Sequence, residues 1–474
     1  MTSASRPSSA ARQREVPSFD SPEHASRAAM HRSALALRRQ QAQFRRRRIG
    51  VVLGLALFGW IVATIATGST VARTAGSTLS RVRLTALVTS TTVVPGSLGP
   101  IAWPATGQGA VAVLGSGLMA ASPRQPVVPI ASLTKMMTAY LILRDHPLLP
   151  GAEGPSLTMT AADVAEWVHA DSTDESNVGI KKGEVLSEFQ LLEALLIPSA
   201  DNVAVMLADW DAGSVPAFVA KMNATARSLG LGSTTYADPS GVNPKSRSDA
   251  TDQAMLAAML MSNPVVRSIV RQPSLPFQVN GTIWNFNPAL GTDGIIGVKS
   301  GYTSQAQACL ATAAFRNVMG KSVLVVAVSL SQPFSLTAAA NADEALLESA
   351  SPLLELWHPT FDATALAKAS LGPSVTELAL AAKVPAVVAW PGLKLNASVV
   401  PLASSNSVGN AALSNERSQV VANLVLSDSL GVLATLPLVA ISSPEATTDT
   451  VGATTVASPA GNGSRKPADT KAGG

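Results

Sequence analysis

Apolar residues recur with two different periods along the chain, and the two periods occupy different regions. Short, nearly continuous apolar runs with strand character fill residues 109–114, 117–120, 308–315 and 322–329. Between them, apolar residues recur at helical spacing over residues 190–196, 218–229 and 252–260. Strands at both ends of a helical middle predict one α+β domain over residues 95–350, an antiparallel sheet flanked by helices. Its first and last strands would share the sheet and bring Ser132 close to Lys299.

A longer apolar run stands near the N-terminus, where residues 49–68 carry no charge and suffice to span a bilayer as a helix. Four arginines at 45–48 precede it, and basic residues favour the cytoplasmic side of a membrane. A cleavable signal peptide is the competing interpretation, although the apolar region of a signal peptide is usually about 7–15 residues long. We expect a retained single-pass anchor in the cell membrane, with the N-terminus inside and the remaining domains outside.

Charge separates this N-terminal segment from the rest of the chain. Residues 1–48 hold eleven arginines and three acidic residues, a formal charge of +8, whereas the whole chain carries +4 and residues 49–474 therefore carry −4. The segment has little apolar periodicity, so we expect a disordered cytoplasmic tail that contacts anionic lipid headgroups beside the anchor. Nucleic acid is not expected as a partner, because no aromatic interleaving or recognised binding fold accompanies the arginines.

Three further segments complete the predicted organisation. Residues 69–94 are rich in Thr, Ser and Val and predict a linker leaving the membrane. Residues 355–442 contain short alternating apolar stretches, which predict a small β-rich domain. Residues 443–474 have too little apolar content to fold, and we expect a disordered tail.

Composition argues against several kinds of chemistry. Cys309 is the only cysteine, which excludes a disulfide framework, and its apolar surroundings predict a thiol packed in a buried strand. The five histidines show no metal-ligand spacing, and the sequence holds no phosphate-binding glycine loop and no Gly-x-Ser-x-Gly motif. We therefore expect neither a metal ion nor a cofactor.

Three short motifs occur in order: Ser132-Leu-Thr-Lys135, Ser199-Ala-Asp201 and Lys299-Ser-Gly301. Taken singly, they are typical of a solvated helix face, a helix N-cap and a strand end. The first, however, lies in an apolar run that predicts a buried helix, where residues three apart share a face. The Lys135 amine can then reach the Ser132 hydroxyl. A desolvated amine near other cations can take a proton from serine and make it nucleophilic.

The sequences that flank the motifs extend the pattern. They read Leu195-Leu-Ile-Pro-Ser199-Ala-Asp-Asn, Ala237-Asp-Pro-Ser-Gly-Val-Asn-Pro244 and Asp293-Gly-Ile-Ile-Gly-Val-Lys299-Ser-Gly-Tyr-Thr303. This ordered set resembles low-molecular-mass penicillin-binding proteins of the serine D-alanyl-D-alanine carboxypeptidase family, particularly those of actinobacteria. The resemblance covers residues 95–350 and implies a β-lactamase/transpeptidase-like fold.

The resemblance also implies catalytic roles. Ser132 would attack the D-Ala-D-Ala carbonyl of peptidoglycan stem peptides, and Lys135 would take its proton. A network of Lys135, Ser199 and Asp201 would protonate the leaving D-alanine, after which water releases the acyl-enzyme. β-Lactams mimic the dipeptide, so they would acylate Ser132 as covalent inhibitors.

The third motif is implied to bind the substrate. Lys299 and Ser300 would hold its terminal carboxylate, with Ser300 keeping the hydroxyl of the commoner threonine. Gly301 and Tyr302 continue the strand that presents backbone N–H groups to the substrate. The amides of Tyr302 and Ser132 would stabilise the oxyanion.

Residue 201 departs from the family pattern, which places asparagine where this chain has Asp201. An asparagine amide can donate and accept hydrogen bonds, whereas a carboxylate only accepts them and keeps Lys135 protonated, as a poorer base. Asn202 could substitute only with a shift of register. A catalytically weak scaffold at the cell wall is therefore one alternative. The other is a β-lactamase, although the chain has no glutamate between Asn202 and Lys299 to act as the deacylating base.

Overall fold

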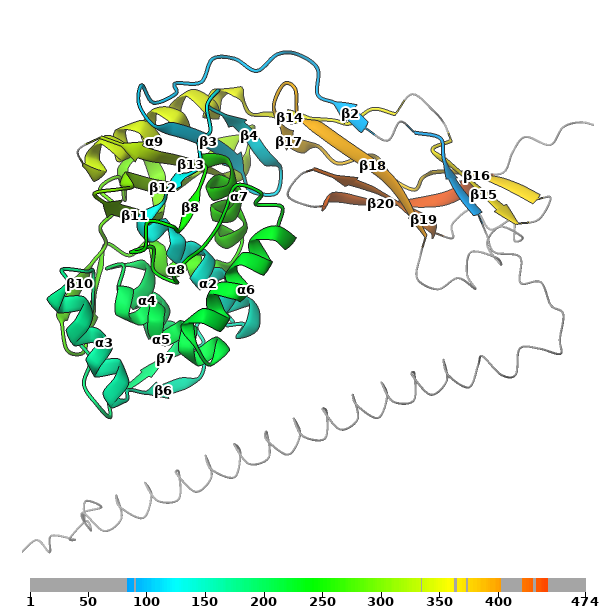
Figure 1. Ribbon diagram of the computed structural model, residues 1–474. Coiled ribbons are helices and arrows are strands. Elements are labelled where there is room, and N and C mark those ends of the chain that lie inside the picture. The colour runs from blue at the N-terminus through cyan, green and yellow to red at the C-terminus, as the bar shows by residue number, and fades with distance from the viewer. Residues whose placement is uncertain are drawn as a thin grey trace, which may run out of the picture. The chain divides into compact units, whose positions relative to one another are not determined.

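The computed structural model describes residues 83–88, 91–333, 335–361, 365–371, 374–401, 420–428 and 432–441 (Figure 1). The predicted cytoplasmic tail at 1–48, the predicted anchor at 49–68 and the predicted tail at 443–474 lie outside these residues. Within the described part, no single helix is long and apolar enough to cross a bilayer. The helices α5 (Asp201–Ala212) and α6 (Val215–Ser228) are long and apolar enough only when taken together, and the chain bends by 84° between them.

A five-stranded antiparallel sheet lies at the centre of residues 108–332, with the strand order β11-β12-β13-β3-β4. Its strands are β3 (Gln108–Val113), β4 (Gly117–Ala121), β11 (Ile295–Thr303), β12 (Gln307–Val318) and β13 (Lys321–Gln332). Val325 of β13 pairs with Val113 of β3, which joins the late strands to the early hairpin. The predicted α+β arrangement, with both sets of strands in one sheet, is confirmed.

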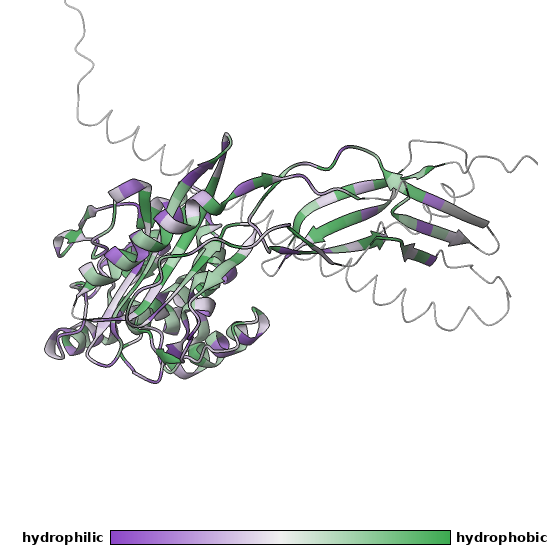
Figure 2. Cartoon of the chain, turned by 90° about the horizontal axis from the view of Figure 1, so that it is seen from above, coloured by the Kyte–Doolittle hydropathy of each residue, from purple (hydrophilic) through white to green (hydrophobic). Residues whose placement is uncertain are grey.

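Both faces of this sheet are buried, because helices cover each of them (Figure 1). Along β13, Leu324 and Val326 pack with the helical middle of the chain. The alternate residues Val323 and Val325 pack in the core that contains α9 (Leu336–Ala350). A strand buried on two faces needs apolar residues at every position, which explains the continuous apolar runs in the sequence. Figure 2 shows the hydrophobic colouring along these strands.

Seven helices fill the middle: α2 (Lys135–Asp145), α3 (Ala161–Ser172), α4 (Glu188–Leu196), α5, α6, α7 (Ala250–Met261) and α8 (Pro264–Val270). The three predicted helices are confirmed inside α4, α6 and α7, to within one residue. Local signals fix their ends, such as the Ser187–Gln190 capping box that begins α4 and the left-handed Gly213 that ends α5. Helix α2 is central, since eight of its 11 residues are buried.

Short elements connect these parts. They are β5 (Val128–Pro129) with β8 (Arg247–Ser248), β6 (Ser156–Thr158) with β7 (Val185–Ser187), β9 (Ser274–Phe277) with β10 (Gly281–Trp284), β14 (Glu355–Trp357) with β17 (Val387–Ala389), and the 3₁₀ turns η1 (Ala131–Thr134), η2 (Thr292–Gly294) and η3 (Ser351–Leu353).

A second sheet has seven strands in the order β1-β15-β16-β20-β19-β18-β2. They are β1 (Arg83–Ala86), β2 (Thr91–Val93), β15 (Ala367–Leu371), β16 (Ser374–Leu380), β18 (Lys394–Pro401), β19 (Val420–Ser427) and β20 (Val432–Ile441). The prediction of a linker at 69–94 is therefore wrong for its described part, where β1 pairs with β15 and β2 pairs with β18. Threonine, valine and leucine suit the edge of a sheet as well as a linker, and pairing decides between the two.

Glu188, the first residue of α4, is an acidic residue inside the buried core. Its side chain is fully buried, and neither carboxylate oxygen has a hydrogen-bond partner within the described part of the chain. Burial raises the pKa of this carboxyl from 4.5 to about 7. The folded protein therefore holds the proton more tightly than the unfolded chain. The contribution of the protonated carboxyl to the free energy of unfolding is complete below pH 4.5 and is lost as the pH rises through about 7.

We expect Glu188→Gln to leave the Tm unchanged near about pH 4 and to raise it above the wild-type value near about pH 8. Thermal unfolding of both proteins at the two pH values measures this difference. An equal Tm shift at both pH values would contradict the assignment.

Candidate active site

Ser132 lies in the 3₁₀ turn η1, directly before α2, and not within the α-helix that the sequence predicted. In a 3₁₀ turn, side chains three residues apart lie almost directly above one another, so Ser132 and Lys135 are aligned more closely than in an α-helix. Ala131, just before the serine, adopts a left-handed conformation with φ of 47°. Such backbone strain costs free energy, and functional sites are among the places where it is found.

The Lys135 side chain is completely buried, and its amine makes three hydrogen bonds. Lys135 Nζ donates to Ser132 Oγ at 2.9 Å, to Asp201 Oδ1 at 2.5 Å and to the Ser240 carbonyl oxygen at 2.9 Å. These three acceptors come from η1, from the start of α5 and from the loop at residues 237–246. The predicted contact between Lys135 and the serine hydroxyl is thus present in the structure.

Two glycines allow other parts of the chain to approach the Ser132 turn closely. A Cβ atom on Gly301 of β11 would lie 2.8 Å from the Ser132 amide nitrogen. A Cβ atom on Gly241 would lie 1.8 Å from the Ala131 carbonyl oxygen, and Gly241 has a left-handed φ of 92°. The turn is therefore held between β11 and the 237–246 loop, where any side chain at either glycine would collide with backbone atoms.

The second motif is divided between two environments. Asp201, the first residue of α5, forms a buried ion pair with Lys135. Asn202 faces another way, because its amide exchanges hydrogen bonds with the backbone N–H and carbonyl of Val178, at 3.2 and 3.0 Å. No register shift brings Asn202 to the lysine. Ser199 has a left-handed φ of 66°, and its buried hydroxyl has no hydrogen-bond partner among the described residues. The structure thus joins Asp201 to Lys135, and it shows no hydrogen bond from Ser199 to either residue.

The third motif lies on β11, an edge strand of the central sheet that runs against η1. Lys299 is 1% exposed, and its Nζ donates to the Ser300 carbonyl oxygen at 2.7 Å. Burial is the main cause that lowers the pKa of Lys299 well below its usual value. The positive charge of Lys135 lowers it further, whereas Asp201 opposes the shift. Ser300 is buried beside it, and the Tyr302 side chain is exposed.

The sequence motifs did not include two groups that the structure adds to the site. The Ser240 carbonyl oxygen accepts a hydrogen bond from Lys135, and the Pro239 carbonyl oxygen accepts one from Thr138 Oγ1 at 2.6 Å. Both carbonyls belong to the backbone and leave no side-chain signature. The only signal in the sequence is the Asp-Pro-Ser-Gly segment at 238–241, which predicts no role for either carbonyl.

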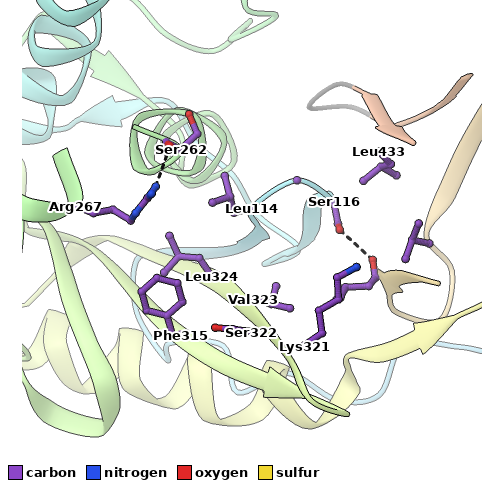
Figure 3. Close-up of a pocket in the computed structure, with 13 residues that line it drawn as sticks. Leu114, Ser116, Ser262, Arg267, Phe315, Lys321, Ser322, Val323, Leu324 and Leu433 are labelled. Carbon is purple, nitrogen blue, oxygen red and sulfur yellow. Dashed lines mark hydrogen bonds between the residues drawn. The ribbon is translucent and has the colours of Figure 1, made fainter. Parts of the chain in front are cut away.

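Other parts of the described structure carry no comparable chemistry. A cavity of about 440 Å³ is lined by residues such as Ser116, Arg267, Phe315 and Lys321, and it contains no motif residue (Figure 3). Cys309 is buried as predicted, and burial raises the pKa of its thiol to about 12, so the thiol stays protonated. Within the described residues, no group of three or more His, Cys, Asp or Glu side chains is arranged to bind a metal ion.

Comparison with known proteins agrees with this geometry. The family profile Peptidase S11, described as D-alanyl-D-alanine carboxypeptidase, matches residues 115–330. The D-alanyl-D-alanine carboxypeptidase DacB2 of Mycobacterium tuberculosis is 36% identical over 215 residues, which cover 44% of this chain and 69% of that protein. The chain belongs to this carboxypeptidase family.

Other similar proteins are covered to different extents. The D-alanyl-D-alanine carboxypeptidase DacF of Bacillus subtilis is 29% identical over 205 residues, or 42% of this chain, and the chain spans 51% of that relative. Among solved structures, the Streptomyces K15 DD-transpeptidase is 25% identical, with 54% of this chain and 100% of that chain covered and a TM-score of 0.47. The match to the family profile contains all three motifs.

The close approach at Gly301 can be tested with a matched pair of variants. Gly301→Ala places a methyl group against the Ser132 turn, so we expect the rate constant for covalent reaction of Ser132 with a fluorescent penicillin to fall by about 10- to 100-fold. Gly232→Ala is the control, because a Cβ atom there has no neighbour within 4 Å. Stopped-flow or gel-based labelling measures both rates. Equal rates for the two variants would show that the contact at Gly301 has no part in positioning the serine.

Proposed function

We propose that this protein is a serine D-alanyl-D-alanine carboxypeptidase that removes the terminal D-alanine from peptidoglycan stem peptides through an acyl-enzyme on Ser132. The observation that carries the proposal is the hydrogen bond from the buried Lys135 amine to the Ser132 hydroxyl. In its neutral form this amine can accept the hydroxyl proton while Ser132 Oγ attacks the substrate carbonyl. Membership of the carboxypeptidase family supports the choice of substrate.

In the proposed acylation, the proton of the Ser132 hydroxyl ends on the leaving group, which is the terminal D-alanine. The Ser132 oxygen bonds to the carbonyl carbon of the penultimate D-alanine, and the peptide bond to the terminal D-alanine breaks. The proton taken by Lys135 passes to the leaving amine, and water then hydrolyses the ester. We assign the oxyanion to the backbone N–H groups of Ser132 and Tyr302, which belong to η1 and to the strand packed against it.

Recognition of the substrate carboxylate is assigned to Lys299 and Ser300. Lys299 forms no ion pair within the described residues, and its amine donates to a single carbonyl oxygen. A buried lysine amine with donors to spare suits an incoming carboxylate, because the anion favours the charged form of the amine and compensates for its lost hydration. β-Lactams carry a similar carboxylate beside a reactive carbonyl, and we propose them as covalent inhibitors.

We further propose that the protein is a single-pass cell-membrane protein, with a cytoplasmic N-terminus and an extracellular catalytic domain. The uncharged run at residues 49–68 and the arginines before it support this placement, and we propose that those arginines contact anionic lipid. A substrate in the cell wall requires the catalytic domain to lie outside the cytoplasm.

A second candidate function is favoured by one specific observation. Asp201 pairs with Lys135 at 2.5 Å, and a paired ammonium has no lone pair with which to take a proton. A wall-binding scaffold that is acylated slowly, or not at all, would use the same fold with this altered site.

Labelling with a fluorescent penicillin tests the proposed function. We expect the full chain to be labelled covalently and Ser132→Ala to remain unlabelled, because the variant lacks the nucleophile. Lys135→Ala should lower the labelling rate by about 10²- to 10⁴-fold through loss of the base. Release of D-alanine from a stem pentapeptide then separates a carboxypeptidase from a protein that is only acylated. A wild-type chain that neither labels nor releases D-alanine would favour the scaffold.

The effect of the ion pair is testable in the same assay. We expect Asp201→Asn to raise the acylation rate by about tenfold or more, because asparagine accepts a hydrogen bond from Lys135 without fixing its charge. Thermal unfolding of the variant checks that the fold survives the loss of the pair. An unchanged rate in a folded variant would mean that Asp201 does not limit the reaction.

A further inference from the structure

The loop at residues 237–246, called the Asp238 loop below, contacts the site through its backbone. We infer that Asp238 is a positioning residue of the acyl-transfer site: its carboxylate shapes this loop so that the Ser240 carbonyl oxygen holds the Lys135 amine against Ser132. The inference rests on the proposed function and adds to it a residue outside the three motifs.

The Asp238 carboxylate gathers hydrogen bonds from across its own loop. Oδ2 accepts from Ser240 Oγ at 2.9 Å, from the Gly241 amide at 2.9 Å and from the Asn243 amide at 3.1 Å. Oδ1 accepts from Ser246 Oγ. One side chain therefore fixes four separate points between residues 240 and 246. Amides that would otherwise lack a partner in a partly buried turn are satisfied by this carboxylate, which sets the path of the loop.

The shaped loop makes three contacts with the catalytic elements. The Ser240 carbonyl accepts from Lys135 at 2.9 Å, and the Pro239 carbonyl accepts from Thr138, one turn further along α2, at 2.6 Å. Gly241 lies against the Ala131 carbonyl, next to the nucleophile. The loop thus contacts both the turn that carries Ser132 and the helix that carries Lys135.

The hydrogen bonds of Lys135 explain how the Asp238 loop can affect the reaction. A lysine side chain has four rotatable bonds, and burial alone does not fix the direction of its amine. Asp201 and Ser240 hold Nζ from two directions, and the third hydrogen bond reaches Ser132. If the Ser240 carbonyl moves, Nζ can follow Asp201 away from the serine. A displacement of about 1 Å in a catalytic group can lower a rate by about 100-fold.

Acylation of the full chain by a fluorescent penicillin tests this role, because it yields the fraction of labelled protein and the acylation rate constant separately. We expect Asp238→Ala to lower the rate constant by about 10- to 100-fold at an unchanged noncovalent Kd for penicillin. Asp238→Asn retains one acceptor oxygen and should fall between Asp238→Ala and the wild type.

Asp252→Asn is the matched control. Asp252 is buried, whereas Asp238 is half-buried, and it likewise shapes its own loop, since it accepts from the Ser233 amide at 2.8 Å and from Thr234 Oγ1 at 2.7 Å. Within the described structure, neither residue of that loop hydrogen-bonds to Lys135. We expect Asp252→Asn to lower the Tm, as Asp238→Asn does, but to keep the wild-type rate constant.

The two claims fail in different ways. A purely structural role for Asp238 predicts a smaller labelled fraction with a normal rate constant, and that result in Asp238→Asn or Asp238→Ala would overturn the positioning role alone. A similar loss of rate in Asp252→Asn would overturn it as well. A folded wild-type chain that is not labelled would overturn the proposed function, and the positioning role with it.

Discussion

The burial of the Lys135 ammonium is the constraint on which the site depends. An ammonium removed from water is tolerated only where hydrogen bonds and a compensating charge replace its hydration. Lys135 has three N–H groups and three acceptors, and each acceptor belongs to a different segment of the chain. The burial of this lysine therefore depends on the Ser132 turn, the start of α5 and the Asp238 loop together.

The central sheet supplies the rigid partner for this assembly. Because β13 pairs with β3, the strand that carries Lys299 and the hairpin before Ser132 belong to the same sheet, although about two-thirds of the domain separates them in sequence. Strand β11 then lies close enough to η1 that only glycine fits at residue 301. The spacing between Ser132 and Lys299 is thus set by backbone packing, which is less compliant than contacts between long side chains.

The sequence predicts those features that repeat or that carry a reactive side chain. Strands buried on both faces gave continuous apolar runs, and the serine and lysine motifs marked the positions that meet in space. Three features left no such signal. The 3₁₀ turn at Ser132 reads like the start of an α-helix, since both place residues three apart on one side. Strands β1 and β2 read like a linker because their partners lie some 280 to 300 residues away. The Ser240 carbonyl has no identity in the sequence, because every residue carries the same group.

Asp201 is best understood from its position beside two buried lysines. Lys135 and Lys299 repel each other, and the Lys135–Asp201 contact is the only ion pair that either lysine makes within the described residues. The carboxylate therefore acts on the two halves of the proposed reaction in opposite directions. It opposes the lowering of the Lys299 pKa by burial and by Lys135, and so favours the charged form of the residue that we propose to bind a substrate carboxylate. It also pairs with Lys135, and this pairing opposes the proposed transfer of a proton from Ser132 to the Lys135 amine. A neutral asparagine would remove both effects, so Asp201 links the proposed carboxylate site to the proposed base.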